Sequence, residues 1–203
     1  MTQRISDRKS LYVKETLKLF LKYGVRSVTI GQITSQLNIS SKTLYQLFED
    51  KTGLVRACFE LYLHSSRQAF ADMEMESTNV ADLLIRFYNK MVETFTRINA
   101  NFFNDLASYF PDIWSADGAF STAEVRMILE RGVREGIFMP NISLDICAQT
   151  LTLLLRSMFE REPDHTHSSQ TLLSNVLWPY VRGICTPQGL EEFRKYRRFT
   201  QAY

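Results

Sequence analysis

The segment from Tyr23 to Leu54 constrains the fold of this chain more than any other part of it. Thr29, with Gln32 three residues later, has the spacing of a capping box, which starts a helix. Ser40 is a preferred N-cap for a second helix, and Asn38 between them tolerates the left-handed backbone of a sharp turn. The segment therefore predicts two short helices joined by a tight turn, a helix-turn-helix.

The second of these helices, about Ser41 to Phe48, has an apolar and a polar face. Leu44, Leu47 and Phe48 are spaced to point inward. The other face carries hydroxyl, amide and ammonium groups, which can bond to base edges and phosphates, although a solvated surface has the same composition. We expect the DNA contacts to come from Thr29, Ser40, Ser41, Lys42, Thr43, Tyr45, Gln46 and Lys51, with Arg4, Arg8 and Lys9 near the N-terminus.

The distribution of charge favours DNA as the partner of this segment. Residues 1–60 hold ten Lys or Arg against five Asp or Glu, a net charge of +5. Residues 61–203 hold fourteen against seventeen, a net charge of −3, so the chain as a whole carries only +2. A basic N-terminal part on an acidic remainder matches the charge pattern of a protein that binds a polyanion.

The same segment resembles the DNA-binding head of the TetR family of transcriptional regulators. The resemblance rests on the pattern F-x3-G-x4-T-x3-I followed by S-x2-TLY-x2-F-x2-K-x2-L. The chain departs from the family at Thr34 (usually Ala), Asn38 (usually Gly), Lys42 (usually Gly or Ala) and Gly53 (usually acidic). Lys42 stands at the groove-facing start of the second helix, so the family's usual base contacts are not carried over there. The matching residues are Phe20, Gly24, Thr29, Ile33, Leu37, Ser40, Thr43, Leu44, Tyr45, Phe48, Lys51 and Leu54.

The composition of the rest of the chain predicts helices throughout. Only 8 Gly and 5 Pro occur in 203 residues, and runs of β-branched residues are rare. We expect an all-α protein of about nine or ten helices, with a helix-turn-helix head at 1–50 and a helical effector-binding and dimerisation body at 51–203. No apolar run of about 18 residues is present, which predicts a cytoplasmic protein without a membrane segment. The spacing of apolar residues predicts the helices outside the helix-turn-helix at about 7–23, 51–73, 80–98, 101–110, 121–135, 144–159, 169–184 and 187–199.

Two of these helices predict a homodimer. The helix at 144–159 is apolar around most of its circumference, and the helix at 169–184 has a broad apolar face with a kink expected at Pro179. A small body cannot cover both, so a second copy of the chain is the economical partner, and the TetR resemblance implies the same. The alternative is one monomeric core. The expected interface residues are Ala148, Leu151, Thr152, Leu155, Phe159, Leu172, Leu173, Val176, Leu177 and Tyr180.

The middle helices concentrate aromatic residues and methionine. These side chains can form an ordinary core or line an apolar cavity for a flat small molecule. The TetR resemblance implies such an effector site in this part of the chain. The candidate lining residues are Phe87, Tyr88, Met91, Phe95, Phe102, Phe103, Tyr109, Trp114, Met127, Leu151 and Leu155.

Other kinds of chemistry find little support in the sequence. The three cysteines (Cys58, Cys147 and Cys185) are widely spaced, and His165 and His167 stand in a turn-like PDHTHSS segment. We expect buried thiols and a solvated loop, with no metal and no cofactor. No phosphate loop, HExxH, CxxC or GxSxG motif occurs, so the protein is not expected to be an enzyme.

These observations predict a sequence-specific transcriptional regulator. We expect a dimeric repressor that binds a palindromic site on double-stranded DNA and is released by a small apolar or aromatic effector. The alternative is a helix-turn-helix regulator that is controlled by a protein partner, or that acts as an activator, with no small-molecule ligand.

Overall fold

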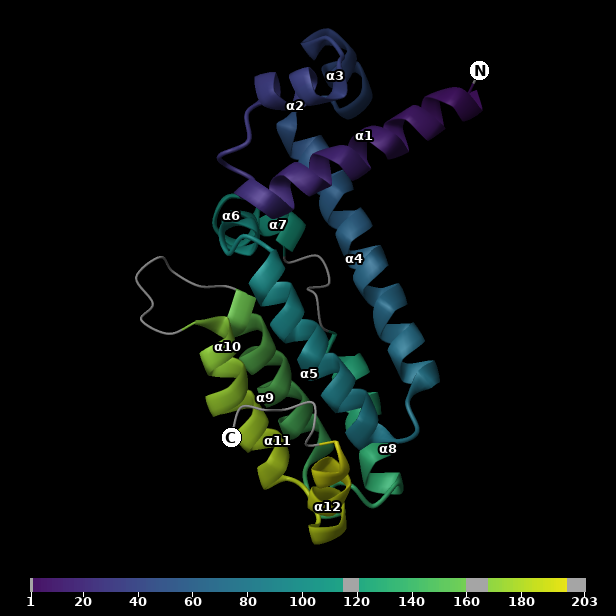
Figure 1. Ribbon diagram of the computed structural model, residues 1–203, viewed down its shortest axis with the longest axis vertical. Coiled ribbons are helices and arrows are strands. Elements are labelled where there is room, and N and C mark those ends of the chain that lie inside the picture. The colour runs from purple at the N-terminus through teal and green to yellow at the C-terminus, as the bar shows by residue number, and fades with distance from the viewer. Residues whose placement is uncertain (1, 115–120, 160–167, 197–203) are drawn as a thin grey trace. The chain divides into compact units, whose positions relative to one another are not determined.

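The computed structural model describes residues 2–114, 121–159 and 168–196, apart from the side chains of 2–6 and 169. All regular secondary structure in these ranges is helical, which confirms the predicted all-α class (Figure 1). The helices are α1 Thr2–Tyr23, α2 Ile30–Leu37, α3 Ser41–Phe48, α4 Lys51–Glu76, α5 Val80–Arg97, α6 Asn101–Tyr109, α7 Pro111–Trp114, α8 Thr122–Arg134, α9 Leu144–Phe159, α10 Ser169–Leu172, α11 Trp178–Gly183 and α12 Pro187–Lys195.

Most predicted helices are found, and several of them differ from the prediction at their ends. α1 begins at Thr2 rather than at Asp7, and α4 continues to Glu76 rather than ending at Met73. Glu and Met are good helix formers, so nothing in the MEME stretch stops α4. Residues 111–114, which the predicted ranges leave outside any helix, form the short helix α7, and Trp114 is its last residue. The end of the last predicted helix falls partly in residues 197–203, which lie outside the described part.

Where the sequence predicts a kink at Pro179, the structure has a π-helical segment, Leu173–Leu177, between α10 and α11. Proline has no N–H and its ring crowds the preceding turn, so the ordinary α-helical bond to the Asn175 carbonyl cannot form. Before it, the Trp178 N–H donates to the Leu173 carbonyl, five residues back. The wider turn lets the helix continue past the proline.

The chain divides into two compact units. The first consists of residues 1–68 and 97–116, and therefore contains α1–α3, the first part of α4, α6 and α7. The second consists of 69–96 and 117–203. The unit that contains the helix-turn-helix is larger than residues 1–50, because α6 and α7 return to it from later in the sequence.

The first unit has an apolar core in which Phe20, Ile33, Leu44 and Leu54 are almost completely buried. One polar atom in this core has no partner. Thr16 on α1 is fully buried, and its hydroxyl makes no hydrogen bond within the described part of the chain. A buried hydroxyl without a partner destabilises the folded state.

Thr16→Val should therefore stabilise the protein by about 1 kcal/mol, because it removes the unbonded hydroxyl and keeps the shape of the side chain. Thr34→Val is the matched control. Thr34 is also buried, but its hydroxyl has partners, since it donates to the Ile30 and Gly31 carbonyls at 3.0 and 3.1 Å. Chemical denaturation of both variants measures the difference. Equal effects of the two substitutions would show that Thr16 is satisfied in solution.

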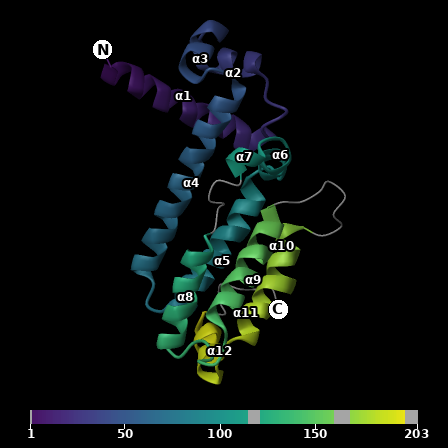
Figure 2. The ribbon, with the colours of Figure 1, turned by 180° about the vertical axis from the view of Figure 1, so that it is seen from behind.

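In the second unit, α5, α8, α9 and the segments α10 and α11 lie side by side in both views of the ribbon, and α12 lies at their lower end (Figures 1 and 2). The loop after α8 is joined to the start of α12, where the Thr186 N–H donates to the Ile137 carbonyl at 2.9 Å. Rings connect the helices: Tyr88 of α5 lies 5.6 Å from Trp178, which lies 5.1 Å from Phe193 of α12 (centroid distances).

No helix in the described ranges is long and apolar enough to cross a membrane. The three cysteines are buried free thiols, as expected, and burial raises the pKa of Cys185 to about 12. His165 and His167 lie outside the described residues. Within the described ones, no group of three or more His, Cys, Asp or Glu side chains could hold a metal ion.

Candidate DNA-binding interface

The helix-turn-helix is built by the local signals that the sequence carries. Thr29 accepts from the Gln32 N–H at 3.2 Å, and the Gln32 side chain accepts from the Thr29 N–H at 2.8 Å, completing the capping box. Asn38 adopts the left-handed conformation with φ 52° and ψ 48°. Ser40 then caps α3 through the Thr43 N–H at 3.1 Å. The predicted helix-turn-helix is confirmed.

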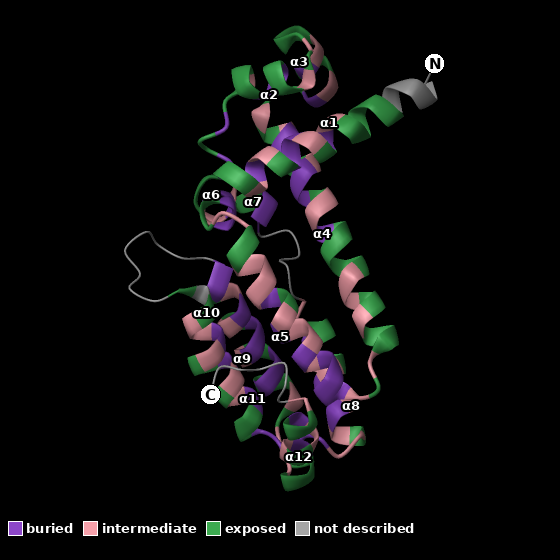
Figure 3. Cartoon of the chain, viewed as in Figure 1, coloured by how far each residue is buried: buried purple, intermediate pink, exposed green. Residues whose placement is uncertain are grey.

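The free face of α3 presents the side chains expected to read DNA. Ser41, Lys42, Tyr45 and Gln46 are all exposed, and most of α2 and α3 is coloured as exposed or intermediate (Figure 3). The hydroxyls of Ser40 and Thr43 lie 2.9 Å apart and share a hydrogen bond. Capping thus occupies two of the predicted contact residues, and the longer side chains of Lys42, Tyr45 and Gln46 reach furthest from the helix.

Basic residues at the start of α1 belong to the same unit. Arg8 and Lys9 are exposed, while the side chain of Arg4 lies outside the described residues. The Lys9 ammonium stands 5.2 Å from the centroid of the Phe48 ring at the end of α3. This cation–π contact places a positive charge at the edge of the reader helix.

Lys51, one of the predicted DNA contacts, makes two hydrogen bonds to the main chain of the same unit. Its ammonium donates to the carbonyls of Val25 and Val28 at 2.9 and 2.7 Å, in the loop between α1 and α2. Burial lowers the pKa of Lys51 below its ordinary value, and the nearby Asp105 carboxylate partly offsets that effect. With two of its three N–H groups used, a phosphate contact can take only the third.

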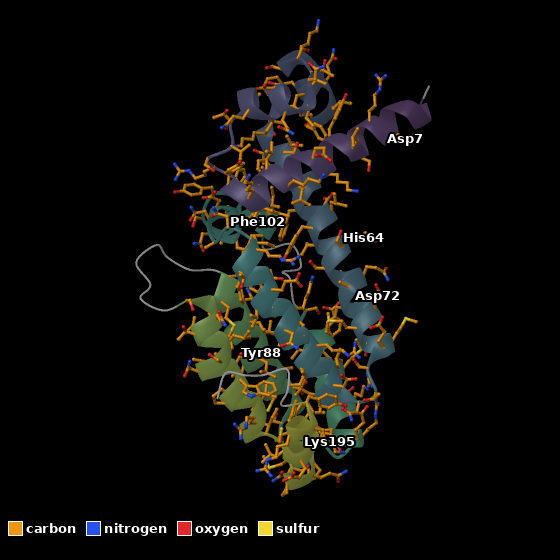
Figure 4. All side chains as sticks on the ribbon, viewed as in Figure 1. Asp7, His64, Asp72, Tyr88, Phe102 and Lys195 are labelled. Atoms are coloured by element: carbon orange, nitrogen blue, oxygen red, sulfur yellow. The ribbon has the colours of Figure 1, made fainter. Side chains whose placement is uncertain are left out.

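The predicted effector-site residues separate into the two units. Phe102, Phe103 and Trp114 are buried in the first unit, and Phe102 lies on α6 beside the end of α1 (Figure 4). They pack against Phe59 and Tyr62 of α4, two aromatic residues that the sequence prediction missed. Ring centroids are 5.7 Å apart for Phe59 and Trp114, and 5.6 Å for Tyr62 and Phe102. The fourth member from this unit, Tyr109, is exposed.

The other candidates lie in the second unit. Tyr88 (labelled in Figure 4) and Met91 are buried on α5, and Phe95 lies 5.1 Å from Phe159 of α9 between ring centroids. Phe87 is half-buried against Phe70, and Leu151 and Leu155 are buried on α9. Met127 does not fit the prediction: it is 61% exposed, because the buried stripe of α8 is formed by Val125, Leu129 and Gly132.

Most of the predicted dimer residues face the core of their own protomer. Seven of the ten are buried there, which leaves their side chains little surface for contact with a partner. α9 is apolar nearly all round, and its sequence could not show which side the protomer covers. Among large apolar residues, the same segments leave exposed Ile146 (64%), Leu153 (67%) and Val176 (40%). Leu172 and Tyr180 are half-buried, and the seven buried residues are Ala148, Leu151, Thr152, Leu155, Phe159, Leu173 and Leu177.

Comparison with known proteins agrees with this geometry. Residues 13–58 match the model of the bacterial regulatory proteins of the tetR family. The chain is 28% identical over 116 residues to YvaF, an uncharacterized HTH-type transcriptional regulator of Bacillus subtilis strain 168. That match covers 57% of this chain and 60% of the relative, so the chain spans about three fifths of the length of the curated relative it matches.

Solved structures extend the likeness over nearly the whole chain. The reduced form of Escherichia coli NemR has a TM-score of 0.71 at 17% identity, covering 89% of this chain and 97% of that one. RolR in complex with resorcinol has a TM-score of 0.63 at 19% identity, covering 100% of this chain and 97% of that one. At such low identity these likenesses show the fold alone. The family match lies over the capped helix-turn-helix: residues 13–58 of this chain are similar to the DNA-binding segment of the tetR family of bacterial regulatory proteins.

Proposed function

We propose that this protein is a dimeric transcriptional repressor that binds a palindromic operator and is released from it by a small apolar or aromatic effector. The observation that carries the proposal is the free face of α3, which exposes Ser41, Lys42, Tyr45 and Gln46. The start of α3 is fixed by the turn at Asn38 and by the N-cap Ser40. Side chains of this kind reach base edges in the major groove, which is wide enough for one helix.

The proposed dimer forms through the exposed parts of α9 and of the segments from α10 to α11. Ile146 and Leu153 stand seven residues apart on α9, so they share one face of that helix. Side chains of this size are seldom left in water as a row, and a second copy of the same face would cover them. Two reader helices then meet two half-sites about 34–36 Å apart, which makes the operator a palindrome.

The proposed effector site lies among the aromatic residues of the second unit. Phe87 and Phe95 are only half-buried, while Tyr88 and Met91 beside them on α5 are buried. RolR, which shares the fold, was solved with the aromatic compound resorcinol. An effector releases the operator only if it binds the non-reading conformation more tightly than the reading one.

The experiment that tests the function is selection of bound duplexes from a random DNA library, with the mass of the protein measured in solution. A palindromic motif bound by a dimer is the expected result, and a panel of aromatic compounds that release that motif tests the effector. A protein that enriches no motif, or only a half-site as a monomer, would contradict the proposal.

Lys42 should contribute to sequence preference rather than to general attraction. Lys42→Ala is expected to weaken the selected operator by about 1–3 kcal/mol and to relax preference at one base step of each half-site. Binding to random duplex should change little, because exposed Arg8 and Lys9 remain. Competition binding with single-base operator variants measures this, and an unchanged preference at every position would remove Lys42 from the reading residues.

A further inference from the structure

The loop between α1 and α2, residues 24–28, is held by side chains from two helices that are distant in the sequence. It runs from Gly24, which has a φ of +84°, to Val28, directly before the N-cap Thr29. Val25 and Val28 are buried, so the loop forms part of the core of the first unit. Its main chain therefore needs hydrogen-bond partners from within the protein.

α4 supplies the partners on one side. Lys51 is the first residue of α4, and its ammonium donates to both the Val25 and the Val28 carbonyls. These two carbonyls flank Arg26 and Ser27, so a single side chain bridges the loop. Its half-buried position fits this use better than a purely DNA-facing one.

α6 supplies the partner on the other side. The buried Asp105 carboxylate accepts from the Arg26 main-chain N–H at 2.7 Å, 79 residues away in the sequence. A Cβ at Gly24 would lie 3.1 Å from the same carboxylate and 3.0 Å from the Asn101 Cβ, so the loop and α6 are in close approach. The neighbouring Asn99 N–H donates to the Leu21 carbonyl at 2.9 Å.

The Arg26 side chain completes the arrangement outside the core. Its guanidinium lies 4.1 Å from the centroid of the Tyr109 ring and donates to the Tyr109 hydroxyl. Asp105 therefore receives the main-chain N–H of Arg26 while the charged side chain of that residue turns to another residue of α6. Both contacts tie the same loop residue to α6.

We propose that Asp105 and Lys51 are positioning residues for DNA reading: together they fix the main chain of residues 25–28 and thereby set where α2 starts and where α3 stands relative to α1 and α6. Val28, the last residue of the loop, is followed directly by Thr29, which is the N-cap of α2. A shift of this loop moves α2, and the turn at Asn38 carries the shift to α3. Neither residue needs to touch a base for this effect.

The inference rests on the proposed function, since it requires a protein that reads an operator. Its test compares full-length variants for binding to the selected operator and to random duplex. Asp105→Ala removes the acceptor, whereas Asp105→Asn keeps an oxygen that can accept from the Arg26 N–H. Asp82→Asn is the matched control, because Asp82 is a buried carboxylate of the second unit that accepts from the Thr78 N–H at 3.1 Å.

Asp105→Ala should lower the ratio of operator to random binding about 10- to 100-fold, the loss of one hydrogen bond to a charged group. Random binding should stay near its original value, because the surface charges of the reader are unchanged. Asp105→Asn should recover most of the ratio, and Asp82→Asn should leave it unaltered. Exchange of the Arg26 amide hydrogen should accelerate in Asp105→Ala and return towards the original rate in Asp105→Asn.

Lys51→Met provides a second, independent variant should Asp105→Ala fail to fold. As a positioning residue Lys51 affects the ratio, whereas one lost phosphate contact lowers the slope of log affinity against log salt by about 0.9 and weakens all sequences alike. A wild-type protein that enriches no motif overturns the proposed function. An enriched motif with an unchanged ratio in Asp105→Ala and Lys51→Met, or a parallel loss of operator and random binding, overturns the positioning role alone.

Discussion

Replacing Ile146 and Leu153 together by glutamate should convert the protein into a monomer and weaken operator binding about 100-fold or more. Both side chains are mostly exposed in the protomer, so the change costs the isolated fold little. In the proposed dimer it places like charges in an apolar contact. Two linked heads bind a palindrome with an advantage of about 10²–10⁴ over a single head, and a monomer loses that advantage.

Sedimentation and operator titration measure the two parts of this prediction. Met127→Glu is the matched control, since Met127 is 61% exposed but stands on α8. It should leave both the mass and the operator affinity unchanged. A double variant that remains dimeric would place the interface elsewhere on the molecule, and a monomer with full operator affinity would show that the heads act singly.

Gly53→Ala should destabilise the first unit by about 1–3 kcal/mol, the typical cost of forcing extra volume into a packed site. A Cβ at this position would lie 2.2 Å from the Phe48 carbonyl oxygen, which is main chain and cannot rotate away. The turn between α3 and α4 creates the close approach. Glu49 has a φ of 65°, and the Asp50 N–H donates to the same Phe48 carbonyl at 2.7 Å.

Gly31→Ala is the control for this substitution. Gly31 lies in α2, and the nearest side-chain atom to a Cβ there is 3.9 Å away, in ordinary contact. Alanine in a helix is favoured over glycine by up to about 1 kcal/mol, so this variant should be neutral or stabilised. Chemical denaturation followed by operator binding tests the pair. Equal stability of the two variants would mean that the α3–α4 turn relaxes without cost.

The reader itself could be predicted because its signals are local. Thr29, Gln32, Asn38 and Ser40 act on main-chain groups within a few residues of themselves, so their pattern in the sequence is enough to place α2, the turn and α3. The apolar spacing of the other helices is equally local, and it gave the bounds of α9 without error. The departure from the TetR pattern at Gly53 could be seen in the sequence. Its reason, the close approach of the Phe48 carbonyl oxygen, could be seen only in the structure.

What the sequence left open depends on which elements meet. An all-round apolar helix such as α9 does not reveal which face its own protomer covers, and the structure moves the exposed face to Ile146 and Leu153. Lys51 has the composition of a phosphate contact until its two carbonyl partners are seen. Asp105 carried no signal at all, since its partner is a main-chain N–H 79 residues earlier.

The difference between what the sequence predicts and what it leaves open has a physical reason. Caps, turns and helical periodicity are interactions between neighbours along the chain, so the sequence by itself determined that this protein is helical and carries a helix-turn-helix. Burial, the hydrogen bonds of Lys51 and Asp105, and the return of α6 to the first unit are contacts between distant residues. Only the tertiary structure decided those contacts, because they depend on which surfaces pack together once the helices have formed.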